Sequence, residues 1–251
     1  MSPIEITAIV FASVFGGAML GVWLRTIIPE HHLSTDTKDT VKLGVGLIGT
    51  MSALVLGLMV ATAKSSYDTR SNELTQLAAD AILLDRLLAH YGPETAEVRG
   101  MLKAGLARLI DLTWPKDGAS ADENNAPSAA KEIIFDKIEE LTPRTESQHS
   151  IQSQAESIAI RVWQTRWLLF EQGGSSISTP FLVVVVFWLT ILFVSFGLFA
   201  PRNATVIITM LVSAMSVSGA IFLILELDQP FTGLIKISSA PLVNVLAMLG
   251  K

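Results

Sequence analysis

Four stretches of about 20 apolar residues constrain this chain more than any other feature of its sequence. Residues 4–24 contain one charge, Glu5 near their start, and residues 43–63, 181–200 and 204–225 contain none. A helix of about 20 residues is roughly as long as the 30 Å hydrocarbon core of a bilayer is thick. A soluble helix of that length would carry a polar face, which these stretches lack. The sequence therefore predicts an all-α integral membrane protein with four transmembrane helices.

The spans pair into two hairpins, and a polar segment of the chain separates them. We expect transmembrane hairpin 1 at residues 1–63, a cytoplasmic helical domain at 64–175, transmembrane hairpin 2 at 176–225 and a cytoplasmic tail at 226–251. This organisation predicts a helical bundle inserted between the two hairpins.

Heptad spacing predicts two long helices in the helical domain. One continues out of the second span to residue 91, and the other covers residues 145–172, with shorter helices expected at 94–113 and 129–141. The apolar seam of the first long helix is Leu74, Leu77, Ala81, Leu84, Leu88 and Tyr91, and that of the second is Ile151, Ala155, Ile158, Val162, Thr165 and Leu169. These seams pack against one another in a bundle, or partly against another copy of the chain.

The distribution of basic residues near the span ends predicts the orientation. The side that holds the middle domain carries Lys64, Arg70, Arg161, Arg166, Lys236 and Lys251, and the other side carries Arg25, Lys38, Lys42 and Arg202. The larger group favours the cytoplasm. We therefore expect a multi-pass protein of the inner (plasma) membrane with cytoplasmic N- and C-termini.

Several classes of function find no support in the composition. Without cysteine, and with no histidine pair at a ligand spacing, no metal site, cofactor or catalytic set is indicated, so the chain is not expected to be an enzyme. His31 and His32 lie near Glu30, Asp36 and Asp39, which indicates a solvated loop or a weak metal or proton site. A net charge of −5 argues against nucleic acid as a partner. Spans without a central charge argue against an ion-coupled transporter.

The second span is rich in small residues. Gly44, Gly46, Gly49 and Gly57 predict close packing of this helix against its neighbours. Thr50, Leu54 and Leu58 follow at spacings of four, so they share one face. Around the axis of an oligomer these residues would form a hydrophobic constriction, a candidate pore and gate, although core residues would follow the same pattern.

Two short motifs flank the ends of spans. Residues 64–73, KSSYDTRSNE, follow the second span, and residues 225–233, LELDQPFTG, end the fourth. Both resemble segments of the bestrophin ion channels. With its four spans and central helical insert, the chain most closely resembles the bestrophin-like family of bacterial membrane proteins, whose function is unassigned and whose resemblance to the true bestrophins is remote. The tryptophan pair that follows the tyrosine in bestrophins is replaced here by Thr69-Arg70-Ser71.

The motif residues have expected roles where the spans meet the water. Tyr67 suits the interface depth, where an aromatic ring and a polar tip are both satisfied. We expect Asp68 with Arg70, or Glu226 with Asp228, to take part in charge pairing that joins the hairpins. Pro230 and Phe231 are expected to end the fourth helix and to anchor the tail.

The resemblance implies a homo-oligomer, with a pentamer favoured, embedded in the lipid bilayer. Such an assembly would conduct small inorganic ions passively through a pore lined by the second span. Ion selectivity and the calcium clasp of animal bestrophins do not carry over. The alternative is a non-conducting membrane scaffold or sensor whose helical domain binds a partner.

Overall fold

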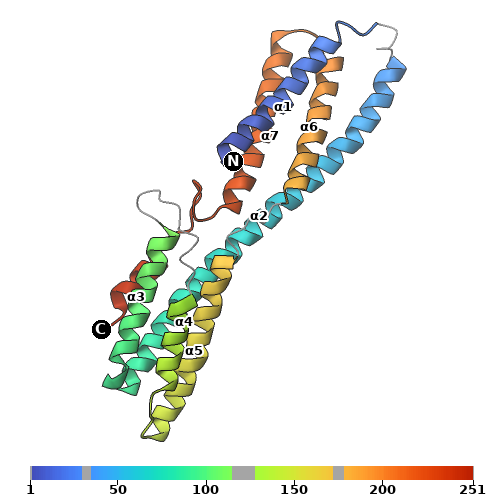
Figure 1. Ribbon diagram of the computed structural model, residues 1–251. Helices are drawn as coiled ribbons and strands as arrows, with labels where there is room; N and C mark the ends of the chain where they lie inside the picture. Colours follow the sequence, from blue (N-terminus) through green and yellow to red (C-terminus); the bar gives the residue numbers. More distant parts are fainter. Residues whose placement is uncertain (1, 30–34, 115–127, 172–177, 251) are drawn as a thin grey trace. The chain divides into compact units, whose positions relative to one another are not determined.

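The chain forms two compact units made of helices (Figure 1). The computed structural model describes residues 2–29, 35–114, 128–171 and 178–250, and all regular secondary structure in these ranges is helical. The first unit comprises Met1–Tyr67 and Ser175–Gln229, and the second comprises Asp68–Gly174 and Pro230–Lys251. The helix α2 (Thr35–Tyr91) contributes residues to both units. His31 and His32 lie outside the described residues.

The first unit contains α1 (Pro3–Leu24), α6 (Thr179–Phe199), α7 (Ala204–Asp228) and the first half of α2. Each of these helices is long and apolar enough to cross a membrane, so the described residues hold four candidate spans. A capping box between Ser2 and Glu5 starts α1, and the Asn203 side chain accepts a hydrogen bond from Val206 N at the start of α7. These caps satisfy amide groups that have no partner within the helix.

Glycines bring α1 into close contact with α6. A Cβ atom placed on Gly21 would collide with the backbone carbonyl of Val194, and one placed on Gly197 would collide with that of Ala18. Gly17 and Gly21 are four residues apart, so both lie on the face of α1 that meets α6. Lipid offers no hydrophobic drive between helices, so their association depends on such close backbone contact.

Two arginines join the ends of the same helices. Arg25 follows α1 and donates to the carbonyl of Ala200, just beyond α6. Arg202 donates to the carbonyl of Val22 in the last turn of α1, at 3.2 Å. Each guanidinium thus supplies donors and positive charge to a helix end whose carbonyls lack intrahelical partners.

The second unit is built on the other half of α2. A turn at Gly92, whose φ of 145° favours glycine, leads through the short 3₁₀ helix η2 (Pro93–Thr95) into α3 (Ala96–Thr113). The buried Thr95 hydroxyl lies within hydrogen-bond distance of the carbonyls of Leu88 and Gly92. The unit continues with α4 (Ser128–Glu139), α5 (Glu146–Glu171) and α8 (Ala240–Met248).

The heptad seam of α2 forms the core of this unit. All six of its members are buried: Leu74, Leu77, Ala81, Leu84, Leu88 and Tyr91. From α5 the seam contributes buried Ala155 and Ile158, whereas Val162 and Leu169 are only half-buried. The seam of α2 therefore packs within the chain, and part of the α5 seam remains accessible.

Two buried aspartates of α2 pair with arginines from neighbouring helices. Asp85 receives two hydrogen bonds from Arg99 of α3, at 2.7 and 3.1 Å, and Asp80 pairs with Arg161 of α5 at 3.2 Å. The hydrogen bond to Asp85 raises the pKa of the Arg99 guanidinium. Buried carboxylates need such partners, so these contacts fix α3 and α5 against α2.

We predict that Gly21→Ala lowers the thermal stability of the extracted protein, because the added methyl group collides with the α6 backbone. Overpacking of this kind costs about 1–3 kcal/mol. Gly16→Ala is the matched control, since a Cβ there meets no described atom within 4 Å. Tryptophan fluorescence gives the apparent melting temperature of each variant. Equal melting temperatures of Gly21→Ala and Gly16→Ala would contradict the close contact of α1 with α6.

We predict a large loss of stability for Arg99→Gln, because the substitution leaves the Asp85 carboxylate buried without its cationic partner. The expected cost is about 3–5 kcal/mol. The control Glu140→Gln removes an ion pair with Lys137 at the surface. The Glu140 side chain in that pair is 66% exposed. That change should cost at most about 1 kcal/mol. Thermal unfolding by circular dichroism checks both, and a small effect of Arg99→Gln would contradict the prediction.

Candidate functional site

One face of α2 in the first unit is apolar and uncovered. Leu54 is 76% exposed and Leu58 is 64% exposed, and Thr50 is also exposed on the same face. The Thr50 hydroxyl donates to the carbonyl of Leu47 at 2.8 Å, so it is satisfied without any outside partner. This face extends toward the start of the helix through Leu43 and Leu47, which the sequence reading did not single out although they continue the same apolar spacing.

The second span is the least buried of the four. In its most apolar window 11% of residues are buried within the chain, against 28% in each of the other three. Val45, Ile48, Val55 and Met59 pack on the core of the unit, while the opposite face of α2 has no such cover. The helix thus uses one side for the fold and leaves the other available.

The glycines of the second span do not pack closely against other described residues of the same chain. A Cβ on Gly44, Gly46 or Gly57 would meet no described atom within 4 Å, and one on Gly49 would make an ordinary contact of 3.7 Å with Leu192. The prediction of close packing was therefore wrong within a single chain. The tightly packed glycines are Gly17, Gly21 and Gly197, which residue type alone does not distinguish from the others.

Two acidic residues of the second motif are buried at the end of α7. Glu226 and Asp228 are 3% and 5% exposed, and neither lacks a partner. Both lie in the last turn, where the helix dipole disfavours negative charge, so other groups must stabilise them. In the same unit, the ammonium group of Lys64 lies 5.3 Å from the centroid of the half-buried Tyr67 ring, a cation–π contact.

The remaining motif residues belong to the second unit. Arg70 is buried, Asp68 is half-buried, and neither lacks a partner. Pro230 is buried two residues beyond the end of α7. The ring of Phe231 packs edge-on against Trp114, with centroids 5.6 Å apart.

Hydrogen bonds hold the C-terminal segment on α3. The Trp114 indole donates to the carbonyl of Ile237 at 3.0 Å, and the Lys103 ammonium donates to that of Leu249 at 3.0 Å. Trp114 was missed in the sequence reading because its contact with Phe231 joins residues 117 positions apart, which no local pattern reveals. The tail after α7 is therefore a packed part of the second unit.

The chemistry available at these positions is limited to burial, charge pairing and helix contact. Within the described ranges, no three His, Asp or Glu side chains converge as a metal ion would require. The candidate site is therefore the uncovered apolar face of α2 in the first unit, which carries Thr50, Leu54 and Leu58.

Comparisons with known proteins agree with this architecture. The family model of the bestrophin-like domain matches residues 12–242. Among solved structures, a point mutant of a bacterial bestrophin homologue from Klebsiella pneumoniae shares the fold. Its TM-score is 0.65, its sequence is 13% identical, and the match covers 93% of this chain and 96% of that one. No curated protein sequence matches the chain.

The family match spans nearly the whole sequence and includes both motifs that carried the resemblance. Four apolar helices, each long enough to cross a bilayer, agree with it. The chain is a membrane protein that belongs to the bestrophin-like family.

Proposed function

We propose that this protein is a homo-oligomeric channel, five-fold by analogy with the bestrophins it resembles, that lets small inorganic ions cross the membrane passively. The uncovered apolar face of α2 is the observation that carries the proposal. Bestrophins, as the resemblance implies, conduct through a pore lined by their second span, and α2 is the second span of this chain. We further propose an inner-membrane location with both termini in the cytoplasm.

The gate in this proposal is a hydrophobic constriction. Around a central axis, Leu54 and Leu58 from each copy would form two stacked apolar rings one helical turn apart. Water leaves a narrow apolar passage readily, so a small change in radius switches it between dry and conducting states. Because no ionisable residue lies between positions 43 and 63, nothing in this stretch of the span would bind an ion tightly and slow it.

The open space beside the α2 glycines supports assembly around this helix. Gly44, Gly46 and Gly57 leave their surroundings unfilled among the described residues of one chain. Small residues in a membrane helix let a second helix approach closely, and here the available partner is α2 or another span of a second copy. A ring of copies would explain both the glycines and the exposed leucines.

We predict that the protein extracted in mild detergent or nanodiscs has the mass of a closed ring, with five copies expected. Native mass spectrometry or light scattering measures this directly. A monomer or a simple dimer would leave no axial passage for α2 to line. That result would favour the non-conducting scaffold or sensor, for which recovery of a stoichiometric partner on the helical domain is the positive test.

We predict that Leu54→Ala and Leu58→Ala each raise ion flux severalfold in liposomes, because a smaller side chain widens and wets the constriction. Anion and cation fluxes are measured separately. The control is Ile208→Ala, which removes a comparable side chain that is 59% exposed on α7. Currents that stay unchanged in both leucine variants, in a preparation that conducts, would contradict the gate assignment.

A further inference from the structure

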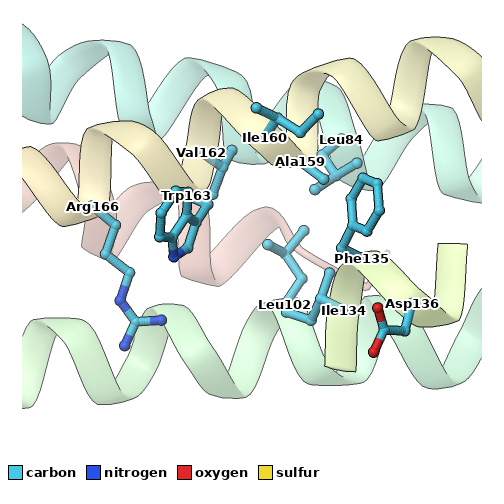
Figure 2. Close-up of a pocket in the computed structure, with 10 residues that line it drawn as sticks. All are labelled: Leu84, Leu102, Ile134, Phe135, Asp136, Ala159, Ile160, Val162, Trp163 and Arg166. Atoms are coloured by element: carbon cyan, nitrogen blue, oxygen red, sulfur yellow. The ribbon is translucent and has the colours of Figure 1, made fainter. Parts of the chain in front are cut away.

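The described residues of the second unit leave an apolar pocket unfilled. Figure 2 shows it between α5 and the neighbouring helices, and its volume is about 320 Å³. Leu84 of α2, Leu102 of α3, Phe135 of α4 and Trp163 of α5 contribute to its wall. Among the labelled side chains that line the pocket, the charged Arg166 and Asp136 lie at opposite ends in this view.

The wall of the pocket favours a hydrocarbon occupant. Leu84 and Leu102 form a buried part of it, while Ile160 is 43% exposed and marks an opening to solvent. Water inside an apolar cavity finds few hydrogen-bond partners, whereas a hydrocarbon gains free energy from every buried methylene group. The volume lies within the range of about 300–1,000 Å³ common for small-molecule sites.

The incomplete seam of α5 explains why this space exists. Val162 is a seam position of α5, yet it is only half-buried because it borders the pocket. Ala159, on the same side of α5, presents only a methyl group to the pocket. A medium-sized aliphatic chain would cover both residues and complete the packing that the helices leave open.

Charge distinguishes the two ends of the pocket. The Nε atom of Arg166 is buried and has no hydrogen-bond partner among the described residues. Burial, together with the nearby positive charge of Arg108, lowers the pKa of Arg166. Asp136 at the other end is exposed to solvent, so water satisfies it. An anion at the Arg166 end would therefore give the buried Nε–H group an acceptor and offset the positive charge of Arg108. A cation near the solvated Asp136 would gain little free energy.

We propose that this pocket binds a fatty acid, with its aliphatic chain along Leu102, Phe135 and Trp163 and its carboxylate on Arg166. Guanidinium groups recognise carboxylates through paired, charge-assisted hydrogen bonds, and the buried Nε of Arg166 is one donor of such a pair. The assignment concerns the second unit alone and is independent of ion conduction.

The test uses the full chain in phosphatidylcholine nanodiscs, with 12-bromododecanoate as the probe. Bromine quenches tryptophan fluorescence at short range, and Trp163 lines the pocket. Empty nanodiscs and the pocket-filling variant Ala159→Phe define the background from partition into lipid. Dodecanoate and uncharged dodecanol then compete for the site, and we expect the acid to bind about tenfold more tightly, as a charge-assisted hydrogen bond implies.

Two arginine variants separate a bound carboxylate from general hydrophobic uptake. Arg166→Gln should weaken dodecanoate about tenfold and leave dodecanol unchanged. Arg86→Gln, an exposed arginine of α2 outside the pocket, should change neither. Circular dichroism and oligomer mass verify that each variant folds.

Several results would overturn the proposal. They are an absence of saturable quenching above the background, equal affinities of the wild-type protein for the acid and the alcohol, or equal effects of the two arginine variants. Displacement of the probe by phosphatidylglycerol in the nanodisc but not by dodecanoate would assign the pocket to a bilayer lipid instead, and would also overturn the fatty-acid assignment.

Discussion

The close contact of α1 with α6 is the interaction on which the rest of the first unit depends. In lipid, helices gain nothing from burying apolar surface against one another, so contact distance and polar interactions decide which helices associate. Gly17, Gly21 and Gly197 permit that contact, and Arg25 and Arg202 join the helix ends. The exposed face of α2 makes no such close contact with the described residues of the first unit, so it remains available to other helices.

The low burial of α2, compared with the other three spans, bears on its function. Three spans bury an equal share of their most apolar window within the chain, whereas α2 buries less than half as much. Its exposed side holds both large apolar residues, such as Leu54, and glycines with open space around them, such as Gly57. The proposal of a pore assembled from several copies rests on this uncovered second span and on membership of the bestrophin-like family.

Different physics governs the second unit, where buried charge selects the arrangement of helices. Asp80 and Asp85 lie on the α2 helix that carries the apolar seam, and each requires an arginine from another helix. Removal of either arginine would leave a buried, unpaired carboxylate, so α3 and α5 are held in one register. The packing that results is complete around Leu77 and Leu88 but incomplete near Val162, where the apolar pocket opens.

The sequence alone determined the helical fold, four candidate spans, the seam of α2 and the family, because length, period and short motifs are local properties. The family resemblance and the all-helical class were confirmed; the roles of Thr50, Leu54 and Leu58 and of the motif residues stay predictions. Only the tertiary structure decided which glycines pack closely, which arginine meets Asp85 and where Phe231 meets Trp114. Each of these contacts joins segments that are far apart in the sequence. Residue type and spacing within one segment do not predict which surface of another segment it will meet.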